Sequence, residues 1–177
     1  MISQTCLIYL LQCKTPKQEN HADFALMEYA AKNWIFHVQS SDDDNSQGST
    51  LSKLMMKLLA LENPAFVNWV KIYDPQNASK QLPPRYYTCK AGLIKVTDSL
   101  LKNGVDVNRW VKGKYGYALQ VASSNNGHEA IAKLLIENGA DVNAQGGYFG
   151  NALHAALAWD NKAIAKLLIQ NGADVDA

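Results

Sequence analysis

Four histidines and three cysteines are the side chains in this sequence best suited to chemistry. Histidine serves as a general base or metal ligand, and a cysteine thiolate serves as a nucleophile or metal ligand. Neither the spacing of these residues nor a recognised motif provides a zinc ligand set, or a nucleophile with its base and orienting group. We therefore expect no catalytic residue, no bound metal and no cofactor. The residues are His21, His37, His128, His154, Cys6, Cys13 and Cys89.

The acidic loop Ser40–Ser49 is the stretch that invites a metal interpretation. An EF-hand calcium loop needs alternating oxygen ligands, a glycine at its sixth position and a glutamate at its twelfth. Counted from Asp42, the sixth residue is Gln47 and the twelfth is Lys53. The motif fails, so the sequence predicts a solvated loop.

Charge and cysteine content restrict the class of protein. The chain has 17 basic and 16 acidic residues, so no global basic field exists to hold nucleic acid or an anionic membrane. Nucleic-acid binding through residues 1–40 is the weakest alternative, because only three lysines are basic there. The apolar run Cys6–Leu11 is too short for a signal core or a membrane span. An odd number of cysteines favours a reducing compartment, and we expect a soluble cytoplasmic protein.

One residue pattern occurs twice near the C-terminus. Glu129–Ala144 and Lys162–Ala177 align with an offset of 33 residues, which relates Gly139 to Gly172. A degenerate earlier copy occupies Arg85–Asn108. Repetition with this period indicates a solenoid, in which short helix pairs bury their apolar faces by stacking on neighbouring pairs.

The last copy illustrates the predicted unit. Asn151 is a suitable cap for a short helix over Ala152–Ala158, and a second helix follows over Ala163–Gln170. Gly172 lies where a left-handed residue ends that helix. Since no further copy follows in the sequence, we expect the outer face of this unit to be partly open. The residues expected on that face are Ile164, Leu167 and Leu168.

These copies resemble ankyrin repeats. The family pattern Thr-Pro-Leu-His-x-Ala-Ala is matched as Asn-Ala-Leu-His-Ala-Ala-Leu at Asn151–Leu157, while Gln120 replaces the histidine in the preceding copy. The closing Gly-Ala-Asp-Val-Asn is intact at Gly139–Asn143. The resemblance implies an all-α fold, an α-solenoid of about three repeats at 85–108, 117–143 and 151–177. It also implies structural roles for His154, whose ring would bond backbone between repeats, and for His128.

A small helical region is predicted before the repeats, over residues 1–75, with a linker over 76–84. Residues 3–12 fit a short helix or a buried strand, and Asp23 is a suitable N-cap for a helix to about Gln39. Helices after Ser49 and after Asn63-Pro64 complete the region. His21 is expected in a loop.

A second resemblance is narrower. The segments Gln4–Gln12 and Phe24–Trp34, and the glycine-rich connection Asn143–Leu153, resemble the C-terminal helical-plus-ankyrin region of fungal NACHT-type NTPase proteins. The phosphate-binding motif Gly-x-x-x-x-Gly-Lys-Ser/Thr of such an NTPase is absent from the sequence. The resemblance therefore implies relation to an NLR-like receptor without carrying over any nucleotide-dependent activity.

Ankyrin stacks bind proteins on a concave face made of the first helices and the connecting fingers, as the resemblance implies. Aromatic side chains together with arginine are common interface hot spots. Tyr115 and Phe149 precede a glycine at equivalent places, so packing between repeats is the favoured interpretation for them. The candidate partner-binding residues are Arg109, Trp110, Lys112, Lys114, Tyr115, Gln145, Tyr148 and Trp159.

Two hypotheses follow. The first is a non-enzymatic protein–protein interaction module that binds a partner, whose identity the sequence does not give, through these residues; a basic spot at Arg109, Lys112 and Lys114 would suit an acidic partner. The alternative is a structural fragment of a larger NLR-like receptor that extends or caps its ankyrin array. Self-association through the open C-terminal repeat is a further expectation.

Overall fold

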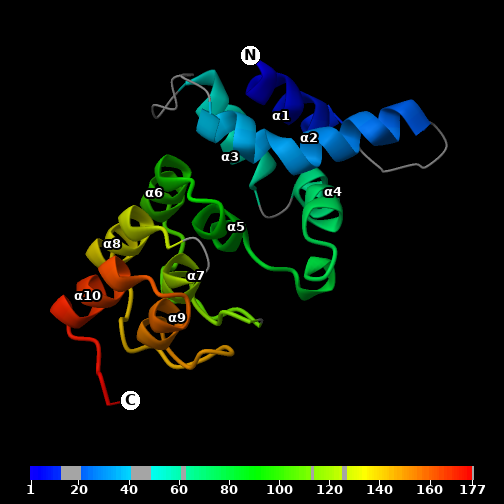
Figure 1. Cartoon of the computed structure of the whole chain (residues 1–177). Helices are drawn as coiled ribbons and strands as arrows, with labels where there is room; N and C mark the ends of the chain where they lie inside the picture. The colour runs from blue at the N-terminus through cyan, green and yellow to red at the C-terminus, as the bar shows by residue number, and fades with distance from the viewer. Residues whose placement is uncertain (13–20, 41–48, 61–62, 113, 125–126, 177) are drawn as a thin grey trace. The chain divides into compact units, whose positions relative to one another are not determined.

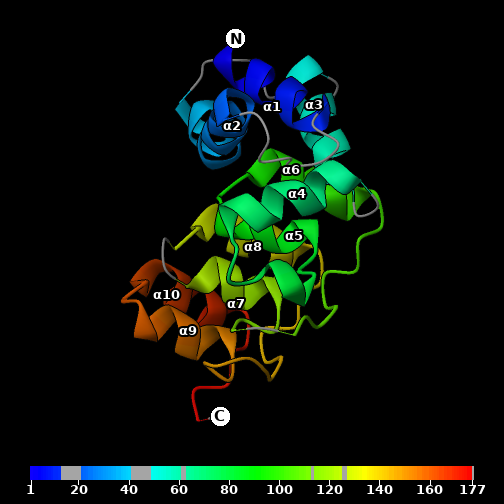
Figure 2. The same cartoon turned by 90° about the vertical axis from the view of Figure 1, so that its right-hand side faces the viewer.

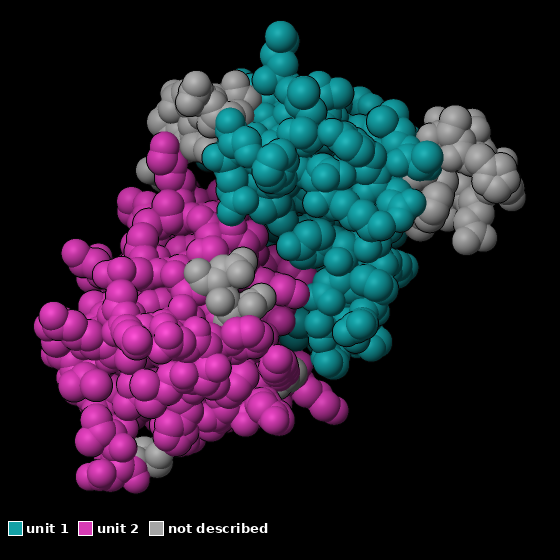
Figure 3. Space-filling model, in the orientation of Figure 1, with its two compact units in different colours: residues 1–84 teal, residues 85–177 magenta. Residues whose placement is uncertain are grey.

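The computed structural model describes residues 1–12, 21–40, 49–60, 63–112, 114–124 and 127–176, and for residues 21–24 it describes the backbone alone. The described residues form ten α-helices and one 3₁₀ helix with no strand, which confirms the predicted all-α fold. The chain separates into two compact units, residues 1–84 and 85–177, which Figure 3 colours separately. Residues 41–48 of the acidic loop and Cys13 lie outside the described residues.

The described residues of the first unit form four α-helices, which Figure 1 labels, and one 3₁₀ helix. They are α1 (Ile2–Gln12), α2 (His21–Ser40), α3 (Thr50–Leu58), α4 (Pro64–Tyr73) and η1 (Ala78–Lys80). Helix α1 packs against α2, α3 and α4. The ambiguous segment 3–12 is thus a helix. The placement of His21 in a loop is wrong, because α2 already begins there, ahead of the proposed cap at Asp23.

Two tryptophans form the centre of this unit. Trp34 of α2 and Trp69 of α4 are fully buried, with ring centroids 5.7 Å apart in an edge-to-face arrangement. The indole Nε1 of Trp69 donates a hydrogen bond of 2.9 Å to the carbonyl of Ala31, so α4 is fastened to α2 as well as packed on it. The predicted caps are present: the side chains of Ser49 and Asn63 accept hydrogen bonds from the first turns of α3 and α4.

The segment 76–84, predicted as a linker, includes η1 and ends in buried residues. Gln81 adopts a left-handed conformation with φ of 50° after η1, and Leu82 is 3% exposed. Helix α5 begins at Pro84, where the fixed φ of proline suits the first helical position.

The second unit is built from three helix pairs. They are α5 (Pro84–Lys90) with α6 (Ile94–Lys102), α7 (Ala118–Ser123) with α8 (Glu129–Glu137), and α9 (Ala152–Ala158) with α10 (Lys162–Gln170). Figures 1 and 2 show the pairs stacked in order, with α5, α7 and α9 in one row and α6, α8 and α10 in another. Helix α7 packs on α9, and α8 packs on α6 and α10. This is the predicted solenoid.

Each second helix ends at an equivalent glycine and buries equivalent side chains. Gly104, Gly139 and Gly172 have φ of 81°, 85° and 86°, the left-handed conformation that the sequence predicts. The prediction for the outer face is wrong for Ile164 and Leu168, whereas Leu167 is half-buried and so partly open, as predicted. Ile164 and Leu168 are 1% and 0% exposed, because α10 turns them towards α9 and α8. Leu157 and Ile169 are the large aliphatic side chains exposed on the described helices of the last pair.

Candidate protein-interaction surface

Two fingers connect the three helix pairs. We define the first finger as Arg109–Gly116 and the second as Gln145–Gly150. Val111 donates its backbone N–H to the carbonyl of Gly116 at 2.8 Å within the first finger. The N–H of Tyr148 donates to the carbonyl of Lys114 at 2.7 Å, so the second finger lies directly beside the first. The side chains of both fingers therefore form a common surface.

Gln120 of α7 holds the second finger in place. Its side chain is 2% exposed, and its Nε2 donates to the carbonyls of Gly146 and Gly150 at 2.9 and 3.0 Å. Its Oε1 accepts a hydrogen bond from the N–H of Tyr117 at 3.3 Å. A buried amide with donor and acceptor both used fixes the finger geometry. This residue occupies the family's histidine position.

The structural role predicted for the ring of His154 is wrong. His154 is exposed, and among the described residues its ring makes no hydrogen bond. The reason is geometric. Gln120 reaches the finger that follows its own pair, and no finger after α10 lies among the described residues. The helix that carries His154 is instead capped by Asn151, whose Oδ1 accepts from the N–H of His154 at 2.8 Å.

Asparagine rungs join successive repeats at the finger side. The Nδ2 of Asn108 donates to the carbonyl of Gly139 at 2.8 Å, and its Oδ1 accepts from the N–H of Asp141 at 2.8 Å. One repeat later, Asn143 makes the same two bonds to Gly172 and Asp174. Each rung needs a side chain that donates and accepts at once, which an amide provides.

A second joint lies at the turn between the helices of each pair. The ring Nε2 of His128 lies 3.1 Å from the carbonyl of Lys90, and Asn161 Nδ2 donates to the carbonyl of Ser123 at 2.9 Å. The structural role predicted for His128 is thus confirmed. Both side chains lie over a glycine of the preceding repeat. A Cβ on Gly92 would be 2.7 Å from Cε1 of His128.

Lys114 lies among three aromatic rings contributed by separate segments. Its Nζ is 5.3 Å from the ring centre of Tyr115, 5.5 Å from that of Phe149 and 5.7 Å from that of Trp159. Tyr115 and Phe149 stack with centroids 5.8 Å apart, as the packing interpretation of these two residues predicted. The ring faces attract the ammonium group and hold it at the surface. Lys114 itself is exposed.

The other candidates surround this group. Tyr148 is 79% exposed and meets Phe149 edge to face, while Trp159 ends α9 and is 39% exposed. Trp110 is 52% exposed, with its Nε1 so close to Gly116 that a Cβ there would lie 3.1 Å away. Arg109, Lys112 and Gln145 are exposed on the same two fingers.

The fingers carry positive charges that no carboxylate of the described residues neutralises. Some lysines elsewhere in the described residues form ion pairs with carboxylates one helical turn away, as Lys32 and Lys102 do, while others, such as Lys166, do not. Among the described residues no carboxylate lies within ion-pair distance of Arg109, Lys112 or Lys114. Such a surface favours an acidic ligand, because no carboxylate of the same chain competes with the ligand for these cations.

Sequence reasoning missed Arg85 beneath the first finger. This guanidinium is 4% exposed and donates from its NH2 group to the carbonyl of Arg109 at 2.7 Å, while its Nε has no hydrogen-bond partner among the described residues. Burial, followed by the charge of Arg109, lowers the pKa of Arg85. It adds positive potential below the fingers. No spacing or motif in the sequence marks an arginine at the start of a short helix as buried.

Residues suited to chemistry are not brought together in the described part of the chain. Cys89 is fully buried, and burial raises the pKa of its thiol to about 12, so it is held as the unreactive protonated form. No group of three or more metal-ligating side chains occurs within the described ranges. Nor does any described helix combine the length and apolar character needed to cross a membrane.

Comparison with known proteins agrees with this architecture. The family described as ankyrin repeats in three copies matches residues 53–146 and 86–177. A protein of Monascus ruber called azaphilone pigments biosynthesis cluster protein L is 33% identical over 167 residues. That match covers 80% of this chain and 34% of the relative, so the chain spans about a third of the relative's length. Ankyrin repeats typically support interactions between proteins rather than catalysis. With three stacked helix pairs, glycine-ended second helices and this match, the chain belongs to the ankyrin-repeat family.

Proposed function

We propose that this protein is a non-enzymatic interaction module that binds an acidic segment of a partner protein on its fingers and concave face. The observation that carries the proposal is Lys114, an exposed ammonium held against Tyr115, Phe149 and Trp159 with no carboxylate beside it in the described residues. A preorganised cation loses little side-chain freedom when it binds, so more of the interaction energy reaches the complex.

The surroundings of Lys114 support an acidic partner in particular. Arg109 and Lys112 extend the positive charge along the first finger, and buried Arg85 lies below it. Exposed aromatic surface at Trp110, Tyr148 and Trp159 flanks these cations. Partner carboxylates would meet the cations while apolar partner side chains cover the rings, a combination typical of hot spots. Gln145 completes the candidate set at the edge of the second finger.

Quantitative affinity capture tests the proposal. The bait variants are Trp110→Ala/Lys112→Ala/Lys114→Ala and the matched control Lys95→Ala/Lys133→Ala, which removes exposed lysines from the second helices instead. We expect the control to retain the partners of the native chain and the finger variant to lose them. Binding of a captured partner should weaken as salt rises, since exposed charges are screened. Identical partner sets for all three baits would refute the finger surface.

We further propose that the chain corresponds to the helical-plus-ankyrin part of a larger NLR-like receptor, where it extends or caps the ankyrin array. Support comes from the resembling segments Gln4–Gln12 and Phe24–Trp34, and from a relative whose length well exceeds the matched region. Sequencing the complete transcript tests this, and a flanking NTPase coding region is the expected result. A cytoplasmic location is part of the same proposal, and the free buried thiols of Cys6 and Cys89 support it.

A further inference from the structure

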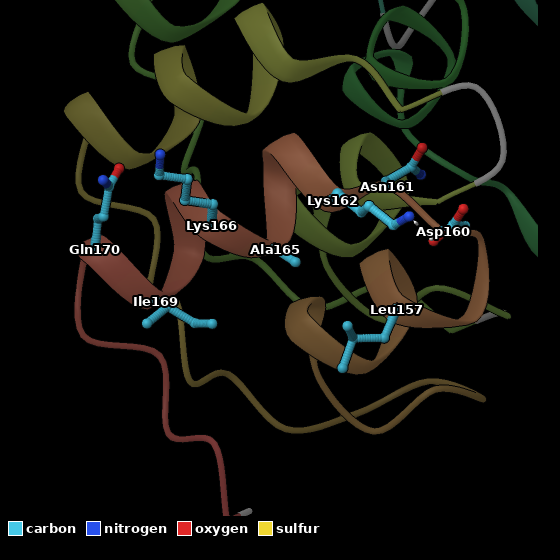
Figure 4. Close-up of a pocket in the computed structure, with 8 residues that line it drawn as sticks. All are labelled: Leu157, Asp160, Asn161, Lys162, Ala165, Lys166, Ile169 and Gln170. Carbon is cyan, nitrogen blue, oxygen red and sulfur yellow. Dashed lines mark ion pairs between the residues drawn. The ribbon is translucent and has the colours of Figure 1, made fainter.

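The outer face of the last helix pair carries an apolar patch with charged ends. We call this the end face; it is a shallow pocket lined by residues of α9, α10 and the turn between them (Figure 4). Leu157 and Ile169 are 59% and 50% exposed there, on either side of Ala165. Burial of such side chains against a partner lowers the free energy of the complex. The remaining residues that line the pocket are Asp160, Asn161, Lys162, Lys166 and Gln170.

A fourth repeat in the register of the first three does not fit this face. At each internal joint, a side chain of the later repeat lies over a left-handed glycine of the earlier one, as Asn161 does over Gly127. The equivalent residue in the last pair is Asp160, which has φ of 53° and carries a Cβ. A Cβ at Gly127 would lie 2.7 Å from Cγ of Asn161, so the Cβ of Asp160 occupies the space that a following repeat needs.

The joint on the finger side of the last repeat also differs from those of the earlier repeats. Asp176 stands where Asn108 and Asn143 form the rungs, because its N–H bonds to Asp174 Oδ1 just as theirs bond to Asp106 and Asp141. A carboxylate has no N–H to donate to the glycine carbonyl of a following repeat. Both joints that link one repeat to the next are therefore missing from the end face.

We infer that the end face pairs with the end face of a second copy of this chain. Figure 4 shows Leu157 and Ile169 on opposite sides of Ala165, and Asp160 and Lys166 on opposite sides as well. A two-fold axis lying in the face brings Leu157 onto Ile169 of the second copy and Asp160 onto Lys166 of the second copy. Apolar and charged contacts are then satisfied together, as an isologous interface requires.

The charges present on each copy permit this pairing. Asp160 already has Lys162 of its own chain 3.6 Å away, but both side chains are more than 80% exposed, so that pair contributes little. Lys166 is exposed and has no carboxylate within ion-pair distance in the described residues. The opposite charges at the two ends of the face thus remain available to a second copy, and they set the orientation in which it docks.

Sedimentation velocity over a concentration series tests the pairing. We expect the native chain to pass from monomer to dimer between about 10 µM and about 1 mM, the range for a small interface. Leu157→Gln/Ile169→Gln should stay monomeric throughout. Lys166→Glu should raise the dissociation constant by about tenfold or more, because it places two acidic groups together. The matched control is Lys133→Glu, the same helical position one repeat earlier, which should dimerise like the native chain.

Mixing two charge variants gives the decisive comparison. Lys166→Glu and Asp160→Lys each place like charges across the two-fold axis, so each alone should dimerise weakly. When the two are mixed, both cross-axis pairs become opposite in charge, and a heterodimer should form. Circular dichroism verifies that each variant is folded. A native chain that stays monomeric at every concentration overturns the inference, as does dimerisation that survives Leu157→Gln/Ile169→Gln or fails equally in the Lys133→Glu control.

Discussion

At the residue scale, Gln120 and His154 occupy the same position in successive repeats but have opposite environments. Gln120 is buried and bonds to two carbonyls of the second finger, whereas His154 is exposed. The consensus residue therefore has the smaller structural role here, and its replacement the larger one. Burial and hydrogen bonding decide that ranking, and the identity of the motif residue does not.

Replacing each of the two residues with leucine tests this ranking. Gln120→Leu should lower the free energy of unfolding by about 2 kcal/mol, since it leaves buried carbonyls without a donor. His154→Leu should change it by less than about 0.5 kcal/mol, as is usual for exposed positions. Urea denaturation followed by circular dichroism measures both values. Equal losses for the two variants would contradict the roles assigned to these side chains.

The raised pKa of Cys89 predicts that the stability of the folded chain falls at alkaline pH. Burial raises the pKa of its thiol from the ordinary 9.0 to about 12, so the folded chain keeps the proton that the unfolded chain releases above pH 9. The resulting stabilisation is complete below pH 9 and is lost as the pH rises towards 12. Between about pH 8 and pH 10 the native chain should lose roughly 1 kcal/mol more stability than Cys89→Ala. Parallel losses in both chains would show that Cys89 ionises normally.

At the element scale, the joints between repeats depend on what lies over each glycine. Gly127 and Gly139 both have positive φ, but only Gly127 is covered, by Asn161 of the next repeat. A Cβ on Gly139 would meet nothing within 4 Å. Substitution at Gly139 therefore measures backbone strain alone, whereas substitution at Gly127 adds the cost of disturbing the joint between α7 and α10.

Alanine at each glycine gives the comparison. Gly139→Ala should cost about 1 kcal/mol through the left-handed conformation alone. Gly127→Ala should cost a further 1–3 kcal/mol or so, because Asn161 has to move from its carbonyl partners. In the double variant Gly127→Ala/Asn161→Gly the clash is absent, so the effects should be less than additive. Thermal unfolding at matched concentration measures the set, and additive losses would count against the joint.

Much of the helical architecture could be predicted from sequence, because its signals are local. Asn63 before Pro64 marks a helix start, and Gly172 marks a helix end without reference to the rest of the chain. The group around Lys114 could not be predicted, since its rings come from positions that meet only when repeats stack. The prediction of an open outer face is wrong at Ile164 and Leu168 for a related reason. Periodicity gives the apolar stripe of α10, but Ile164 is covered by its own pair whether or not another repeat follows.

At the scale of the whole molecule, the division at Pro84 and Arg85 predicts separable folding. Residues 85–177 have a core of their own, formed by stacked helix pairs. Expressed alone, this fragment should be helical by circular dichroism and unfold in one cooperative transition. The shorter fragment 117–177 should be largely unfolded, because repeat stability comes from neighbour interfaces and about three repeats are needed. A disordered 85–177 fragment would show that the first unit is required for folding.

The joints between repeats run in one direction, and this has a consequence for how such a gene could lengthen. Among the described residues, Gly92 and Asn108 of the first pair receive contacts from the following repeat, and Asn161 and Gly172 of the last pair contact the preceding repeat. The middle pair forms joints with both neighbours. His128 and Gly139 contact the first pair, and Gly127 and Asn143 contact the last pair. Tandem duplication of the middle segment would therefore yield a longer array with every joint intact. Duplication of the final segment would instead place Asp160 and Asp176 at an internal boundary, where neither joint could form.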